Sequence, residues 1–211
     1  MTSNLFDRNV SREPKGGKIM FFKKVPQSPQ YFLPDAAHDS ENVQQSFLAQ
    51  ELAREITCRK ARSATLITLC IGTDKITGDC LGPLVGTKLL ERGYRHPVNG
   101  TLQHPVHAVN LLSTISALQE NYAHPFLLVI DAAVGPAEKI GCISLSRAPI
   151  SPGKGICRPL PPVGNLSLTG IVGEASEHCA ADLPYTRLFV VNTLADFICG
   201  AVLATEKLLA K

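Results

Sequence analysis

The chain alternates between short apolar runs and segments in which apolar residues recur every three or four positions. The first periodic segment begins after Asp39 or Ser40, and both residue types cap helices. Its apolar positions are Val43, Phe47, Leu48, Leu52 and Ile56. This spacing predicts a first helix.

A second unit follows directly. Ala64 to Ile71 is rich in Leu, Ile and Thr and stops at Gly72, which is typical of a strand buried on both faces. After a loop at 72–80, a helix is predicted over Leu81 to Arg92, with Pro83 in its first turn, where a missing N–H costs little. The pattern therefore predicts strand, loop and helix in succession.

The alternation continues to the end of the chain. Further strands are predicted at Val106 to Leu112, Phe126 to Ile130, Ile140 to Arg147 and Ser167 to Val172. Further helices are predicted from a cap at Ser113 to about Ala123, and over Arg187 to Leu209, where apolar residues form one stripe. Strands and helices in this order favour an α/β sandwich of three layers with a mostly parallel sheet. In such sheets ligands bind beyond the carboxyl ends of the strands.

Residues 1–40 break the pattern. They combine six prolines and glycines with scattered charge, and no apolar periodicity lasts more than a few residues. We expect a loosely ordered N-terminal arm over residues 1–40 that adds little to the core. Residues 41–211 are then expected to form one domain, since a chain of 211 residues is long enough for a single substantial core.

Composition narrows the class of protein. Hydrophobic residues make up 45% of the chain and charged residues 18%, which excludes a disordered chain or a coiled coil. No apolar run reaches the roughly 20 residues of a membrane span, so none is expected. The net charge is +3, but acidic and basic side chains balance from residue 63 onward. The domain therefore lacks the clustered cations of a nucleic-acid-binding surface.

The cysteines and the first residues indicate the compartment. The seven cysteines contain no C-x-x-C pair, and an odd number cannot all pair within one chain. The first residues lack the apolar core of a signal peptide. We expect free thiols and a reducing, cytoplasmic location.

The loop at 72–80 holds the first candidate for chemistry. Its glycines allow tight turns and close approach of the backbone. It does not resemble a phosphate-binding loop, because no Gly-Lys-Ser/Thr ends it and Asp79 would place a negative charge beside a phosphate. Asp79 is either a catalytic carboxylate or the N-cap of the following helix. Asp74 is interpreted as a turn residue.

Asp131 follows the most apolar predicted strand, Phe126 to Ile130. Burial at such a place raises the pKa of a carboxyl group, which suits an acid or a base. The alternative is a structural residue that binds the backbone amides of the next loop. If the strands before Asp79 and Asp131 are neighbours, the two carboxylates face each other across one crevice. Such a pair can share a proton, which leaves one group as base and the other as acid.

A loop rich in Pro and Gly between Ala148 and Asn165 is long enough to predict a functional role. The six histidines show no ligand spacing, so a closed zinc site is not expected, and we predict no cofactor. A metal held by Asp79, Asp131 and one histidine, such as His178, remains the alternative.

Short motifs between residues 63 and 210 carry a family resemblance. They are Gly72-Thr73-Asp74, Thr77-Gly78-Asp79, Leu81-Gly82-Pro83, His107-Ala108-Val109-Asn110-Leu111, Ile130-Asp131-Ala132, Pro152-Gly153-Lys154-Gly155, Leu160-Pro161-Pro162-Val163-Gly164 and Thr169-Gly170-Ile171-Val172. In order and spacing they resemble the YyaC family of sporulation proteins from spore-forming Firmicutes. That family is similar to the spore germination protease and more distantly to hydrogenase maturation endopeptidases. The resemblance implies their phosphorylase/hydrolase-like fold.

The resemblance also implies roles for individual residues. In the germination protease, the proposed catalytic pair is an Asp within an Asp-x-Leu-Gly-Pro motif and an Asp that ends a later strand, and they match Asp79 and Asp131 here. In the hydrogenase endopeptidases the same two places, with a histidine, bind the metal of the substrate. Within the matched motifs we expect substrate-binding residues at Thr73, Asp74, Asn110 and Lys154.

The implied function is a sporulation-associated peptidase that hydrolyses peptide bonds with a pair of aspartates. Its expected substrate is a protein or peptide, with small spore proteins as candidates, in the forespore or spore interior, and a homo-oligomer is compatible with this role. The alternative is a non-catalytic sporulation factor that binds a peptide or protein partner in the same crevice, because a shared fold does not transfer an activity.

Overall fold

The computed structural model describes residues 30–32, 38–152, 160–175 and 183–210. Its strands are β1 (Gln30–Phe32), β2 (Thr65–Cys70), β3 (Val98–Asn99), β4 (Pro125–Gly135), β5 (Ile143–Ser146) and β6 (Leu166–Glu174). Its α-helices are α1 (His38–Arg59), α2 (Leu81–Glu91), α3 (Leu111–Asn121) and α4 (Leu188–Leu209). Short 3₁₀ helices are η1 (Thr77–Cys80), η2 (Ala137–Lys139) and η4 (Leu183–Tyr185).

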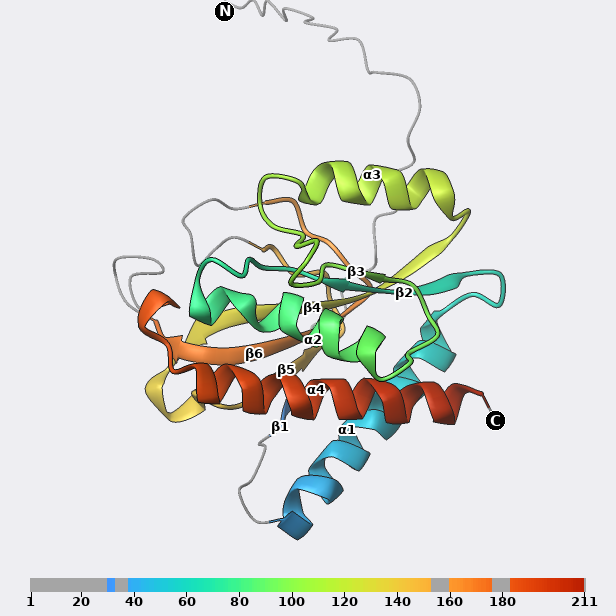
Figure 1. Cartoon of the computed structure of the whole chain (residues 1–211). Helices are drawn as coiled ribbons and strands as arrows, with labels where there is room; N and C mark the ends of the chain where they lie inside the picture. The colour runs from blue at the N-terminus through green and yellow to red at the C-terminus, as the bar shows by residue number, and fades with distance from the viewer. Residues whose placement is uncertain (1–29, 33–37, 153–159, 176–182, 211) are drawn as a thin grey trace, which may run out of the picture.

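The described strands form one sheet in the order β1-β5-β6-β4-β2-β3, between two layers of helices (Figure 1). β2 pairs in parallel with β3 and β4, and β4 pairs in parallel with β6. β5 pairs with β6 in the antiparallel sense, and β1 pairs with β5 in the antiparallel sense at the edge of the sheet. The predicted α/β sandwich with a mostly parallel sheet is confirmed. The carboxyl ends of β2, β4 and β6 consequently lie at one edge of the sheet.

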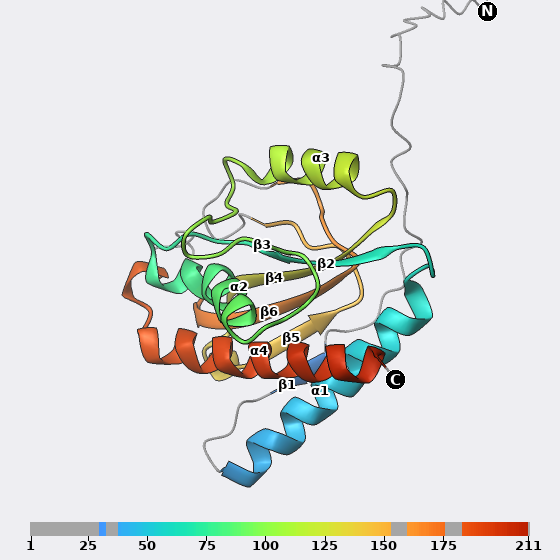
Figure 2. The same cartoon turned by 45° about the vertical axis from the view of Figure 1, so that its right-hand side comes forward.

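Each face of the sheet has its own core. In β4, Phe126, Leu128 and Ile130 pack in the cluster with α1, α2 and α4, whereas Leu127 and Val129 pack in the cluster with α3. Figure 2 shows α3 on one face and the other three helices on the opposite face. Because successive side chains of a strand alternate between faces, the position of a residue along its strand tells which helical layer it faces.

α4 is a long core helix, as its apolar stripe predicts. Val191, Leu194, Ile198 and Val202 are buried in the cluster that it shares with α1 and α2. By length and composition it is the one helix among the described residues that could cross a membrane. In the structure, 50% of its most apolar window is buried inside the domain, as in the core helix of a folded protein.

The predicted arm is wrong at residues 30–32, which form β1. This strand pairs with β5, and Phe32 is only 2% exposed in the core, with its ring centroid 5.9 Å from that of Phe47 in α1. The domain therefore begins before the predicted boundary at residue 41. Three residues are too few to show a period, and their pairing with β5 joins segments distant in the chain. Residues 1–29 and 33–37 lie outside the described residues.

The predicted strand at Val106 to Leu112 is also wrong. Val106 forms only an isolated parallel bridge with Ile71, and the chain then turns into α3, whose N-cap is Asn110 and not Ser113. A side-chain hydrogen bond closes this turn, because the Asn110 Oδ1 atom accepts from the backbone N–H of His107 at 2.8 Å. The strand beyond β2 is β3, which has only two residues.

Candidate active site

Asp79 lies in η1, on a tight loop that follows β2. The Gly72 N–H donates to the carbonyl oxygen of Val106 at 2.8 Å, and the Thr73 N–H donates to the carbonyl oxygen of Asp79 at 3.1 Å. Gly72 has a φ of 141°, and a Cβ there would clash with that carbonyl oxygen of Asp79. Glycine is therefore required for the loop to fold back on the end of the strand.

The first turn of α2 rests directly on the end of β2. A Cβ on Gly82 would clash with the backbone oxygen of Ile71, so the close approach depends on the missing side chain. The N-cap of α2 is Cys80, and no side chain caps the helix. The interpretation of Asp79 as an N-cap is therefore wrong. The Asp79 carboxylate makes no capping hydrogen bond to α2.

Asp131 lies within β4, whereas the sequence predicted that it ends the strand. β4 continues to Gly135, and Asp131 pairs with Thr169 of β6. The side chain is 9% exposed, and its Oδ1 atom accepts a hydrogen bond from the N–H of Ala132 at 2.9 Å. Since Ile130 belongs to the core of α1, α2 and α4, Asp131 faces the α3 side of the sheet.

The two carboxyl groups differ in proton affinity. Burial, followed by the negative charge of Asp79, raises the pKa of Asp131 to about 8, against the smaller opposing effect of the Ala132 N–H. Burial also raises the pKa of Asp79 to about 6, and the Thr73 N–H and the charge of His107 oppose this. Both shifts favour the protonated form, more strongly for Asp131, so the coupled pair keeps a proton at neutral pH.

His107 is a neighbour of Asp79 that the sequence pattern did not reveal. It follows Val106, whose bridge with Ile71 brings it to the edge of the sheet where β2 ends. Its Nδ1 atom accepts a hydrogen bond from the Val109 N–H at 3.3 Å, which leaves Nε2 as the ring nitrogen able to donate. No ligand spacing signals this residue, and only the bridge shows where it lies.

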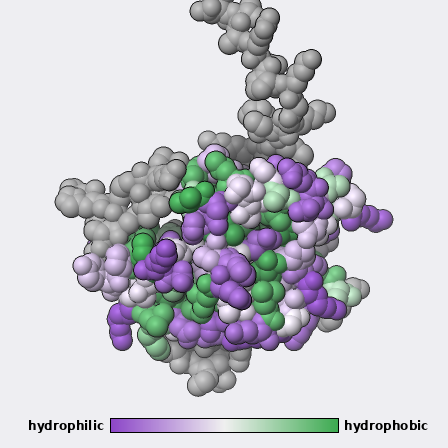
Figure 3. All heavy atoms as spheres, turned by 45° about the horizontal axis from the view of Figure 1, so that its top comes forward, coloured by the Kyte–Doolittle hydropathy of each residue, from purple (hydrophilic) through white to green (hydrophobic). Residues whose placement is uncertain are grey.

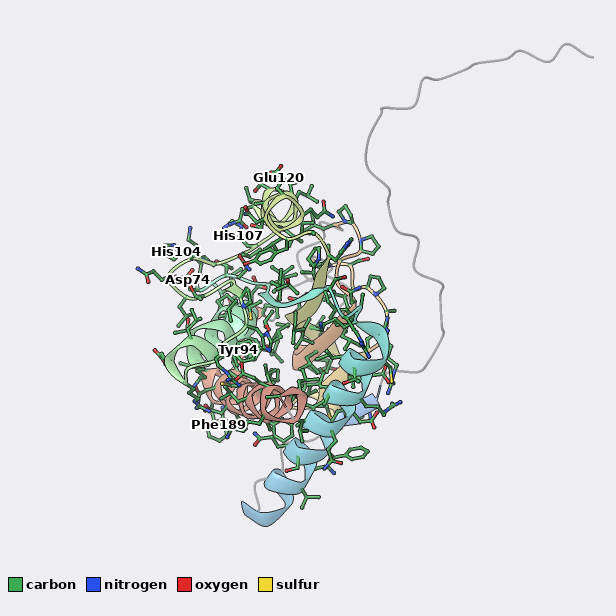
Figure 4. The ribbon with its side chains drawn as sticks, turned by 90° about the vertical axis from the view of Figure 1, so that its right-hand side faces the viewer. Asp74, Tyr94, His104, His107, Glu120 and Phe189 are labelled. Atoms are coloured by element: carbon green, nitrogen blue, oxygen red, sulfur yellow. The ribbon has the colours of Figure 1, made fainter. Side chains whose placement is uncertain are left out.

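His107 also lines a groove of about 620 Å³ together with Gly100, His104, Asn110 and Thr114, among others. Figure 4 shows His104 and His107 on the same side of the molecule, in the segment between α2 and α3. With α3 turned forward, Figure 3 shows hydrophilic and hydrophobic side chains interspersed on this face. Neither Asp79 nor Asp131 lines the groove, but His107, whose charge acts on Asp79, belongs to its lining.

Two of the predicted substrate-binding residues lie on the loop of Asp79. Thr73 is half-buried, and its Oγ1 atom accepts from the Lys75 N–H at 3.4 Å. Asp74 is exposed, and Figure 4 places it on the same side of the molecule as His107. Both residues are therefore near the pair along the chain.

Of the other two predicted substrate-binding residues, one lines the groove and one lies outside the described residues. Asn110 lines the groove, but its side chain also braces the loop, since Nδ2 donates to the Pro105 carbonyl oxygen at 3.0 Å and Oδ1 accepts from His107. Lys154 lies outside the described residues, and so does His178 of the alternative metal site.

Within the part of the chain that the structure describes, no group of three His, Cys, Asp or Glu side chains could hold a metal ion. Cys80, next to Asp79, is not an activated nucleophile. Burial and the charge of Asp79 raise the pKa of its thiol, and the thiol donates to the Thr77 carbonyl oxygen at 3.0 Å. Asp79, Asp131 and His107 are therefore the candidates for chemistry at this edge among the described residues.

Comparison with known proteins assigns the chain to a family. The family model described as "Protein of unknown function (DUF1256)" matches residues 36–201. The chain is also similar to the "Uncharacterized protein YyaC" of Bacillus subtilis (strain 168), with 34% identity over 194 residues, which cover 92% of this chain and 90% of that protein. The chain belongs to the YyaC family. The range that matches the family model contains Asp79, His107 and Asp131, so the candidate site lies inside the part of the chain that this YyaC family member shares with the family.

Proposed function

We propose that this YyaC family member is a peptidase that uses Asp79 as general base and Asp131 as general acid. The observation that carries the proposal is the pair of interacting carboxyl groups at the carboxyl edge of the sheet, where burial raises both pKa values and that of Asp131 more. Two carboxyl groups with separated pKa values divide the roles of base and acid between them.

The chemistry follows from this distribution of protons. Ionised Asp79 takes a proton from water as the water oxygen bonds to the scissile carbonyl carbon, and Asp131 gives its proton to the carbonyl oxygen. In the second step Asp79 gives its proton to the leaving nitrogen as the C–N bond breaks. Asp131 recovers its proton from a hydroxyl of the intermediate as the carbonyl forms again, so both groups return to their starting state.

The biological setting is proposed on the family assignment. As a member of the YyaC family, the chain is expected to act in the cytoplasm of the forespore or in the spore interior, with a spore protein as substrate. The small spore proteins are the first candidates, because the family resembles the germination protease, which degrades them.

Cleavage of total spore protein and of a peptide library by the full-length chain tests this proposal. Asp79→Asn and Asp131→Asn should each lower cleavage by at least about a hundredfold, because an amide keeps the shape but cannot exchange the proton. Glu120→Gln is the control, since it removes an exposed carboxylate of α3 that has no role in the proposed site. Wild-type protein that cleaves nothing while it binds a sporulation partner, equally well in both variants, would establish the non-catalytic alternative.

A further inference from the structure

Asp131 begins a row of polar side chains that crosses three strands on the α3 side of the sheet. Asp131 pairs with Thr169 of β6, and Thr169 pairs with Ser144 of β5. Paired residues point to the same face. The residues that precede them in each strand, Ile130, Leu168 and Ile143, belong to the core on the opposite face. The three polar side chains therefore share the face on which the proposed chemistry takes place.

The two hydroxyl groups of this row have no hydrogen-bond partner among the described residues. Thr169 is half-buried and Ser144 is 9% exposed, and their backbones pair in the sheet, but neither hydroxyl makes a hydrogen bond there. Ser146, two residues further along β5, differs because its Oγ atom accepts from the Ala148 N–H at 3.3 Å. Neither hydroxyl oxygen is among the fully buried unpaired atoms of the described residues, so both remain open to solvent beside Asp131 and are free to bind a ligand.

The row limits the chemistry of that ligand. Hydroxyl groups both donate and accept, which suits a chain of alternating N–H and C=O groups. Among Asp131, Thr169 and Ser144 there is no cation, and the charge of Asp79 at one end disfavours an anionic ligand. Neighbouring strands lie about 4.8 Å apart, so the row spans about 10 Å, the length of about three residues of extended polypeptide.

We propose that Thr169 and Ser144 form the floor of a subsite that binds the main chain of an uncharged, extended peptide on one side of the scissile bond. The inference rests on the proposed peptidase function, which places the scissile bond at Asp131. Since β4 lies between β6 and β2 in the sheet, the groove at His107 lies on the other side of the scissile bond. The bound peptide then crosses the sheet from His107 past Asp131 to Ser144.

Fluorescence anisotropy of labelled, uncharged hexapeptides with the full-length chain measures binding separately from cleavage. Thr169→Val and Ser144→Ala should each weaken binding about fivefold, the usual effect of one hydrogen bond. Thr169→Ser, which keeps the hydroxyl, should restore binding. Ser146→Ala is the control, because its hydroxyl already binds within the protein. Urea denaturation of each variant separates loss of binding from loss of fold.

Peptides with single backbone esters sharpen the test. An ester at the position that contacts Thr169 should weaken binding to the wild type and cause no further loss in Thr169→Val, because the N–H donor and the hydroxyl form one interaction. Binding without cleavage would support this subsite and refute the peptidase. Cleavage with unchanged binding in both hydroxyl variants would refute the subsite and leave the peptidase standing. Absence of hexapeptide binding to the wild type would also overturn the subsite.

Discussion

Replacement of Asp131 by Asn is the most direct test of the buried acid. The carboxyl group holds its proton up to a pH of about 8 in the folded state, whereas its ordinary pKa is 3.8. Between these values the folded state binds more protons than the unfolded state, so the free energy of unfolding falls as the pH rises. Asn cannot ionise and keeps an oxygen that can accept from the Ala132 N–H. The variant should therefore lose this pH dependence.

The size of the effect follows from the pKa shift. Each pKa unit corresponds to about 1.4 kcal/mol, so a rise from 3.8 to about 8 sets a ceiling of about 6 kcal/mol. A buried site relaxes and admits water when it becomes charged, so we expect about 3 kcal/mol. The Asn variant should thus be about as stable as the wild type near pH 4 and more stable by about 3 kcal/mol near pH 8. For a domain of this size, such a difference raises the Tm by roughly 6–12 °C.

Urea denaturation followed by circular dichroism at pH 4.5, 6, 7 and 8 measures this difference, and comparison with the wild type cancels the titration of other groups. Asp74→Asn is the control, because Asp74 is exposed and should change stability little at any pH. A difference between Asp131→Asn and the wild type that does not grow with pH would refute the reasoning. It would mean that the carboxylate is ionised in the folded protein at neutral pH and cannot serve as the acid.

Three further predictions follow from the same structure. The kcat/KM of peptide cleavage should rise through a pH of about 6, as the base Asp79 loses its proton, and fall through about 8, as the acid Asp131 loses its proton; a profile without the upper limb would contradict the assignment of the acid. Gly82→Ala should cost more than about 3 kcal/mol in urea denaturation, because its Cβ meets the backbone at the end of β2, while Gly173→Ala, with only ordinary contacts, should cost less than about 1 kcal/mol. Phe32→Ala should cost about 3–4 kcal/mol, and a truncation that removes β1 should destabilise the domain similarly, whereas an unchanged urea midpoint would show that β1 lies outside the domain.

The sequence predicts much of the fold because the central elements have strong local signals. The run from Ala64 to Ile71 and the run before Asp131 are apolar enough to indicate buried strands, and the stripe of α4 indicates a core helix. β3 carries no such signal, because a strand of two residues has no period. The apolar side chain of Val106 is buried in the core on the α3 side of the sheet, although the residue makes only a bridge to the sheet.

The candidate site, like the fold, is predictable from the sequence only in part. That Asp79 and Asp131 lie at one edge is predictable, because parallel strands end on the same side of a sheet. The pKa difference between them is not predictable, because it depends on burial and on the distance between side chains 52 positions apart in the chain. His107 is likewise brought to the site by a bridge that no local pattern indicates.

The sequence by itself therefore determined the local properties of the longer elements: that the central strands and the core helices form, and which of their residues can carry chemistry. Only the tertiary structure decided the order of the strands and the register between them. Register is a property of pairs of segments, and a shift of one residue would turn Thr169 and Ser144 to the opposite face. The row beside Asp131 exists because three strands, separated in the chain by loops, align these three residues in one register.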